Sequence, residues 1–168
     1  MTRRSQRGAA TLVWMLVWLA LIAGTTWALQ RWLSPPPLAV TAQGDWLIPR
    51  GSDGHYHVPG TVGGQPVRFL VDTGASLVVV TEALAQRAGL PPGEPVTFQT
   101  AAGDSPGRIV PGMPVALTGP QGQSRTVSRV RVGVGLVGAS DDDALLGQSF
   151  LRHFDVQIKD GVMRLTAR

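Results

Sequence analysis

One aspartate lies in a sequence context that could carry chemistry. Asp72 follows an apolar run at residues 69–71, opens an Asp-Thr-Gly turn, and is followed by a second apolar run at residues 77–80. A carboxylate placed between two buried strands is expected to be partly buried, which is costly unless it is hydrogen-bonded or shares a proton. The same tripeptide is also an ordinary tight turn, so by itself the pattern is weak. Three neighbours could supply hydrogen-bond donors: Thr73, Gly74 and Ser76.

Further stretches make the pattern more specific. Upstream are Gly54-His55-Tyr56 and the run Gly63-Gly64-Gln65-Pro66-Val67-Arg68, and downstream are Thr100-Ala101-Ala102-Gly103 and Leu145-Leu146-Gly147-Gln148-Ser149-Phe150-Leu151. With Asp72-Thr73-Gly74-Ala75-Ser76, these stretches resemble the aspartic proteases. The resemblance is to the single-domain, retropepsin-like branch and its membrane-anchored bacterial members. It covers residues 54–168.

The resemblance implies roles for particular residues. Asp72 would be the catalytic residue, Thr73 would grip the partner's loop across a two-fold axis, and Ser76 would hydrogen-bond the catalytic carboxylate, with Gly74 supporting the loop. Two hydrophobic residues and a glycine would pack beneath this loop: Leu145, Leu146 and Gly147.

The expected flap is the feature that departs from the family. The residues that would cover the substrate are Thr100, Ala101, Ala102 and Gly103, within a segment that contains Pro106 and has no Tyr or Trp. This departure motivates an alternative, in which the same β fold is a non-catalytic dimerisation or peptide-binding module. A third possibility is a structural domain in which Asp-Thr-Gly is only a turn.

Peptide hydrolysis by this route needs two carboxylates that share one proton: one activates a water and the other polarises the scissile carbonyl. The chain contains no second Asp-Thr-Gly or Asp-Ser-Gly, and the other aspartates in turns, Asp53, Asp104 and Asp160, lack the apolar run before them. An active enzyme would therefore be a homodimer with Asp72 from each chain on the two-fold axis, most active on the acidic side. Its substrate would be a peptide or protein, and we expect no cofactor and no metal.

We expect an all-β body, a small closed β-barrel of the single-domain aspartic protease type with one short helix. Hairpins are predicted around Gly63-Gly64 and Asp160-Gly161. The helix is predicted at residues 82–88 with Thr81 as its N-cap, and a further short one is possible near residues 148–153. Residues 103–107 are expected to form a turn because they combine Gly, Asp, Ser and Pro.

The N-terminal segment is predicted to be one transmembrane helix. Residues 8–29 carry no charge, and Arg3, Arg4 and Arg7 precede them, against Arg31 alone after them. This bias predicts a single-pass inner-membrane protein with a cytoplasmic N-terminus at residues 1–7 and a periplasmic body. An uncleaved anchor is favoured over a signal peptide because the apolar run is long and lacks a good cleavage site. Residues 30–50 are expected to be a Pro-rich spacer and residues 51–168 the protease domain.

Charge and composition exclude other classes. All 11 acidic residues and 11 of the 15 Lys and Arg lie at or after residue 45, so that part is neutral and the pI of 11.0 comes from the N-terminal segment. A nucleic-acid partner is therefore not expected. The absence of Cys excludes thiol catalysis and disulfides. The Gly-x-Gly-x-x-Gly at residues 133–138 lacks the helix that a dinucleotide site requires.

Overall fold

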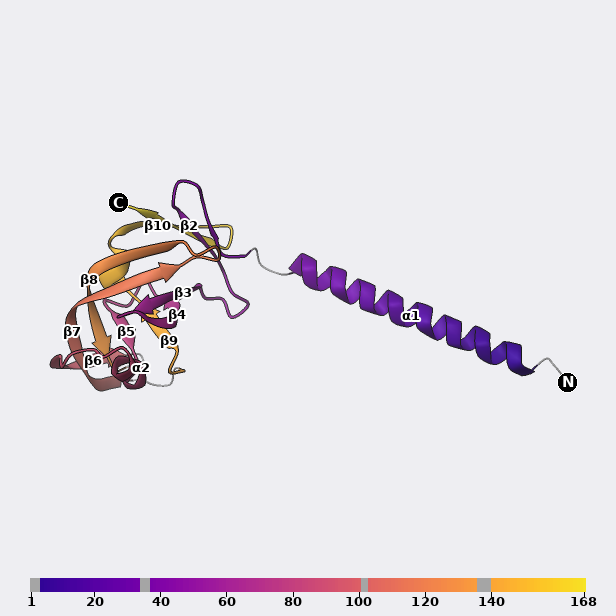
Figure 1. Cartoon of the computed structure of the whole chain (residues 1–168), viewed down its shortest axis with the longest axis horizontal. Coiled ribbons are helices and arrows are strands. Elements are labelled where there is room, and N and C mark those ends of the chain that lie inside the picture. The colour runs from indigo at the N-terminus through magenta and orange to yellow at the C-terminus, as the bar shows by residue number, and fades with distance from the viewer. Residues whose placement is uncertain (1–3, 34–36, 101–102, 136–139) are drawn as a thin grey trace. The chain divides into compact units, whose positions relative to one another are not determined.

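The computed structural model describes the backbone of residues 4–33, 37–100, 103–135 and 140–168. The chain divides into two compact units, Met1–Pro35 and Pro36–Arg168. Figure 1 shows one long helix in the first unit and an assembly of strands in the second.

The first unit is helix α1 (Arg4–Leu33). Its segment Val13–Arg31 is long and apolar enough to cross a membrane, and its large apolar side chains are exposed. The Thr25 and Thr26 hydroxyls donate to the carbonyl of Ile22 at 3.0 and 2.7 Å, which satisfies these polar groups within the helix. A single N-terminal apolar helix of this kind is typical of a membrane span or of a signal sequence.

The second unit contains two sheets. The larger has the order β3-β4-β9-β5-β8-β7-β6, and β3 also pairs with β7, which closes six of these strands into a ring. Its strands are β3 (His57–Val62), β4 (Gln65–Val71), β5 (Val78–Val80), β6 (Glu94–Thr100), β7 (Gly103–Thr118), β8 (Ser124–Val134) and β9 (Asp143–Leu146). The smaller sheet has the order β1-β2-β11-β10, formed by β1 (Ala39–Val40), β2 (Trp46–Pro49), β10 (Phe154–Lys159) and β11 (Val162–Ala167). The all-β prediction is confirmed.

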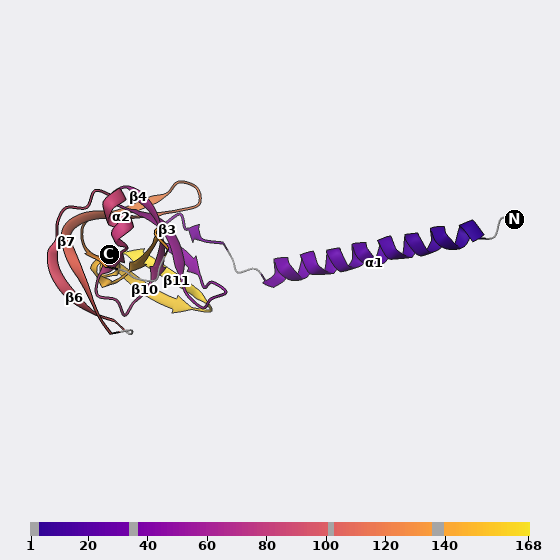
Figure 2. The ribbon, with the colours of Figure 1, turned by 90° about the horizontal axis from the view of Figure 1, so that it is seen from below.

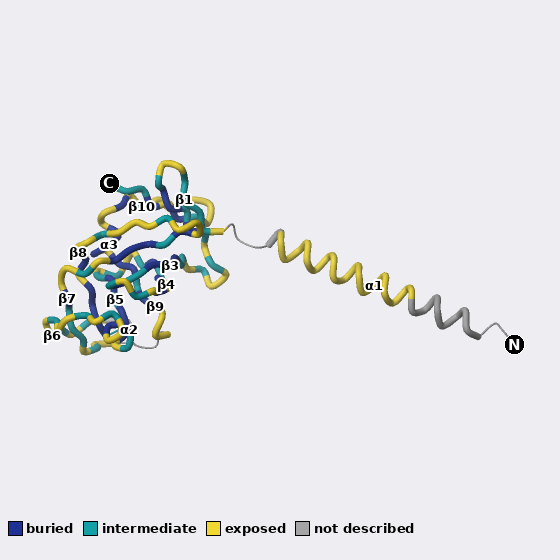
Figure 3. The backbone as a smooth tube through the Cα atoms, in the orientation of Figure 1, coloured by how far each residue is buried: buried dark blue, intermediate teal, exposed yellow. Residues whose placement is uncertain are grey.

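The core follows from alternation along the strands. In β3 and β4, every second residue is buried, among them Val58, Val62 and Phe69. Figure 3 shows buried segments of the body in dark blue.

The ring of strands closes where β3 pairs with β7, and at position 60 of β3 only glycine fits. A Cβ on Gly60 would lie 2.1 Å from the carbonyl oxygen of Ala116 and 2.6 Å from the ring of Phe69.

Both predicted helices of the body are present. The side chain of Thr81 accepts a hydrogen bond from the N–H of Leu84 at 3.1 Å and so caps α2 (Glu82–Arg87), which agrees with the sequence prediction. The short helix α3 (Gln148–Leu151) follows β9, and Phe150 stacks on Phe154 with ring centroids 5.1 Å apart.

The expected spacer at residues 30–50 differs from the structure, because β1 and β2 lie within it. β2 pairs with β11, and Trp46 and Ile48 are buried in the core. Asp45 is also buried and forms an ion pair with Arg164 of β11, whose hydrogen bonds lower the pKa of that carboxyl. The folded body therefore begins well before residue 51. Figure 2 shows the hairpin of β10 and β11 that completes this sheet.

The prediction of a turn at residues 103–107 is wrong. These residues form the start of β7 and pair with β6, beginning with Gly103 opposite Thr100. The glycines here allow close packing instead of a turn. A Cβ on Gly107 would lie 2.4 Å from the ring of Phe98, and one on Gly133 would lie 2.9 Å from the same ring. Gly133 thus lies in β8, while residues 136–138 of the Gly-x-Gly-x-x-Gly pattern fall outside the described residues.

Candidate active site

Asp72 lies directly after β4, at the point where the strand ends in a turn. Its N–H donates to the carbonyl of Leu146 at 3.1 Å, and its Oδ1 accepts a hydrogen bond from the N–H of Gly74 at 2.8 Å. Ala75 N–H donates back to the carbonyl of Asp72 at 3.3 Å, which closes the turn. Asp72 is half-buried, so its carboxylate is oriented by the backbone and still accessible from outside.

Strand β9 supports this turn from the side. It runs parallel to β4 with Leu70 opposite Leu145 and Val71 opposite Leu146. Gly147 follows at a point of very close approach: a Cβ there would lie 2.2 Å from the carbonyl oxygen of Leu77 and 2.5 Å from that of Ala75. The structure therefore brings Leu145, Leu146 and Gly147 to the Asp72 loop.

Two residues that follow Gly147 fasten the loop, and no role was predicted for them from the sequence. Gln148 donates its side-chain amide to the carbonyl of Thr73 at 3.0 Å and its N–H to the carbonyl of Ala75 at 2.8 Å. The buried hydroxyl of Ser149 accepts from the N–H of Val78 at 2.9 Å and donates to the carbonyl of Arg131 at 2.8 Å. Their position directly after the Leu-Leu-Gly element was the available signal.

The other predicted site residues are distributed as follows. Thr73, Gly74 and Ser76 are exposed on the loop, where a second chain could reach them, and the roles of Thr73 and Ser76 stay predictions. In the expected flap, Thr100 is the last residue of β6 and Gly103 is the first residue of β7, and the two are paired with each other. Ala101 and Ala102 lie outside the described residues.

A row of half-buried aliphatic side chains lies beside Asp72. Leu70 and Asp72 are two residues apart on an extended chain and so face the same side of the sheet. Leu145 lies opposite Leu70 on β9, and Val79 of β5 lies opposite Leu145. All three aliphatic residues are partly exposed. The surface next to the carboxylate is thus apolar across three strands.

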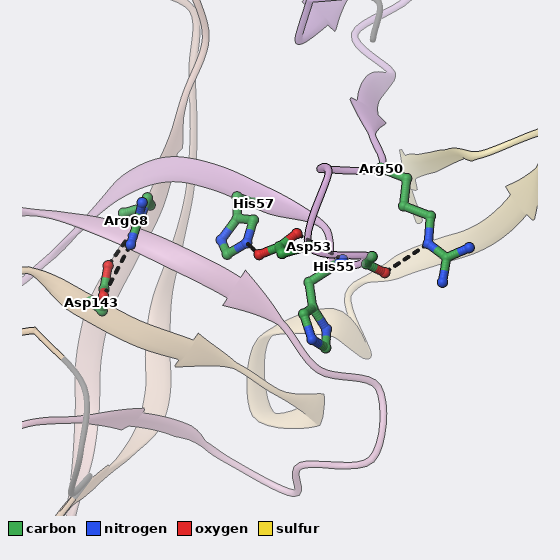
Figure 4. Close-up of polar contacts among 7 residues, drawn as sticks. Arg50, Asp53, His55, His57, Arg68 and Asp143 are labelled. Atoms are coloured by element: carbon green, nitrogen blue, oxygen red, sulfur yellow. Dashed lines mark hydrogen bonds and ion pairs between the residues drawn. The ribbon is translucent and has the colours of Figure 1, made fainter. Parts of the chain in front are cut away.

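Charged pairs flank this row. Arg68 of β4 and Asp143 of β9 form a two-point ion pair at 2.8 and 3.1 Å, which lowers the pKa of Asp143 and raises that of Arg68. His57 Nε2 and Asp53 Oδ2 are 2.6 Å apart (Figure 4). The described residues contain no group of three or more His, Cys, Asp or Glu side chains that could hold a metal ion.

Comparison with known proteins agrees with this geometry. The family model described as aspartyl protease matches residues 58–150, which is 93 of the 168 residues. The chain therefore belongs to the aspartyl protease family.

A solved retropepsin-like aspartic protease from Rickettsia conorii is similar in structure, with a TM-score of 0.56 and 27% identity over 73% of this chain and 98% of that one. An uncharacterised protein of Rickettsia prowazekii, RP867, is 31% identical over 86 residues, which are 46% of this chain. The match spans only 37% of the length of that relative.

The close approach at Gly147 gives a testable prediction. Gly147→Ala should destabilise the body by about 3 kcal/mol, the upper end of the usual cost of overpacking, because the new methyl group meets two backbone carbonyls that cannot rotate away. Chemical denaturation of the full chain in detergent would measure it. Gly64→Ala is the control, since it meets no atom within 4 Å and carries only the cost of its positive φ, about 1 kcal/mol. Equal losses in the two variants would contradict the role of Gly147.

Proposed function

We propose that the protein is an aspartic endopeptidase that acts as a homodimer, with Asp72 of both chains forming the catalytic pair. The observation that supports this most is the placement of Asp72: its carboxylate is oriented by the N–H of Gly74 at a strand end and remains accessible. One chain supplies a single such aspartate, and two carboxylates that share a proton are needed to activate water and polarise a carbonyl. A two-fold axis beside the loop would provide the second.

The substrate of this proposed enzyme is an extended peptide with apolar side chains next to the cleaved bond. The row of Leu70, Leu145 and Val79 borders Asp72 and is only half-covered. An apolar substrate side chain placed against this row would bury apolar surface on both partners, at about 25 cal/mol per Å². Acidic or basic side chains at the same position would lose hydration without gaining a partner there.

The catalytic proposal is tested by a charge-removing variant. Asp72→Asn in the full-length chain in detergent should lower the hydrolysis of unfolded protein at acidic pH by between about 100-fold and 10,000-fold, since the general acid–base pair is lost. Asp160→Asn makes the same chemical change in the turn between β10 and β11, where Asn tolerates the positive φ of 50°. That control should keep wild-type activity. Equal activity of wild type and Asp72→Asn would refute the proposal.

The proposal extends to location. Helix α1 would anchor the chain in the inner membrane, with residues 1–7 in the cytoplasm and the protease domain in the periplasm. The supporting features are the exposed apolar segment Val13–Arg31 and the three arginines that precede residue 8. Basic residues are retained on the cytoplasmic side of a span.

The absence of native Cys allows this orientation to be measured with single introduced thiols. In intact spheroplasts, a membrane-impermeant maleimide should label Ser52→Cys, at an exposed position of the body, and should label Ser5→Cys only after the membrane is permeabilised. Labelled protein should remain in the membrane fraction at full length. If only Ser5→Cys were labelled in intact spheroplasts, the orientation would be the reverse of the one proposed. Release of a shortened chain would indicate a cleaved signal peptide.

A further inference from the structure

The turn that precedes β3 is braced by one carboxylate that the proposed mechanism does not use. Asp53 Oδ1 accepts a hydrogen bond from the N–H of His55 at 3.0 Å, and its Oδ2 lies 2.6 Å from Nε2 of His57. An ionised carboxylate only accepts hydrogen bonds, so Nε2 of His57 is the donor. Figure 4 shows the His57 ring turned toward Asp53 and the His55 ring turned away from it.

The backbone of the same turn is tied together at several further points. Gly51 N–H donates to the carbonyl of His55 at 2.7 Å, and Gly54 N–H donates to that of Gly51 at 3.0 Å. Arg50 Nε donates to the carbonyl of Gly54 at 2.7 Å. The side chain of Asp53 adds one contact within the turn, to the N–H of His55, and one contact to His57, the first residue of β3.

This turn abuts the strand that carries Asp72. The carbonyl of Tyr56 accepts a hydrogen bond from the N–H of Val71 at 2.9 Å, and that residue immediately precedes Asp72. The register of β3 and β4 pairs His57 with Leu70, and its continuation by two residues sets His55 opposite Asp72. Tyr56 thus lies between the two residues that Asp53 holds.

The end of β4 is therefore held from two sides. On one side, the carbonyl of Leu146 accepts the N–H of Asp72, and this bond belongs to the pairing of β4 with β9. On the other side, the carbonyl of Tyr56 accepts the N–H of Val71 beyond the last strand pair of β3. That second bond lies beside the turn, where Tyr56 also bridges to Arg50 and where Asp53 contacts the residues on either side of Tyr56.

We propose that Asp53 is a positioning residue for the reaction at Asp72: by holding His55 and His57 it fixes the Tyr56 carbonyl, which in turn fixes the peptide group before the catalytic aspartate. This inference rests on the proposed protease function. Asp53 would touch neither substrate nor Asp72, and would act only through the backbone that joins Tyr56 to Val71.

The arrangement suits a reaction in mild acid. The N–H of His55, and next the ring of His57, lower the pKa of Asp53. Because the folded-state pKa lies below the ordinary one, the carboxylate stays charged as the pH falls, until the pH approaches that lowered value. The ionisable groups beside the pair are His55 and Arg50 of the same turn, and Arg68 on β4 and Asp143 on β9, which are paired with each other. The contacts of Asp53 with His55 and His57 are thus retained in the mildly acidic pH range in which two carboxylates that share a proton would be active.

The first test reads the backbone directly, by amide hydrogen exchange in the full chain in detergent micelles. In Asp53→Ala, protection of the Val71 N–H should fall about tenfold, the loss expected for one hydrogen bond, while the amides of Val67 and Phe69 keep theirs. Arg68→Gln is the matched control: it breaks an ion pair on the same strand without touching the turn, and should leave Val71 protected. Unchanged protection of Val71 in Asp53→Ala, or an equal loss along all of β4, would overturn the inference.

The second test uses kinetics. Asp53→Ala should lower kcat about tenfold with little change in KM, because a misplaced catalytic group affects the transition state more than substrate binding. Arg168→Gln, which breaks the exposed ion pair with Asp155 of β10, should keep both constants. Wild-type kcat in Asp53→Ala would overturn the inference while leaving the proposed function intact. A wild-type enzyme without activity would overturn the proposed function, and the exchange experiment would still decide whether Asp53 holds the Val71 peptide.

Discussion

The parallel pairing of β4 with β9 is the constraint on which the site depends. It joins residues more than seventy positions apart and delivers the carbonyl of Leu146 to the N–H of Asp72. Parallel strands need a long connection, and here the chain between them builds β5, α2, β6 and the β7–β8 portion of the ring. Gly147 then lets the chain pass within van der Waals contact of the loop carbonyls, so that Gln148 and Ser149 can fasten them. Much of the body therefore contributes to the position of the short turn at residues 72–75.

The sequence was informative where chemistry is local. The run of apolar residues before Asp72, the cap at Thr81 and the Asp160-Gly161 hairpin follow from alternation, capping and turn preferences, and all three are present. The placement of Leu145, Leu146 and Gly147 beside the loop came from the family resemblance and not from local pattern, because it depends on a long-range parallel pair.

Two errors arose where local composition was a poor guide. Residues 103–107 carry turn-forming residue types, yet they form a strand because Gly107 makes room for the ring of Phe98, which comes from a different strand. The segment before residue 51 was expected to be a spacer because of Pro35, Pro36 and Pro37, although Trp46 and Ile48 alternate inward and pair with the last strand of the chain. The hydrogen bonds of Gln148 and Ser149 join distant segments, so the only sequence signal for them was the position of these residues directly after the Leu-Leu-Gly element.

In the proposed enzyme, two copies of the chain complete one catalytic centre. Confinement of both copies to one membrane by α1 would raise their local concentration and favour a weak dimer. The most direct measurement is the separation of the two Asp72 carboxylates in a crystal structure of the dimer. In a catalytic pair, their nearest oxygens should lie about 3 Å apart and share a proton. A dimer in which these carboxylates are separated well beyond hydrogen-bonding distance, or a chain that stays monomeric at high concentration, would contradict this proposal.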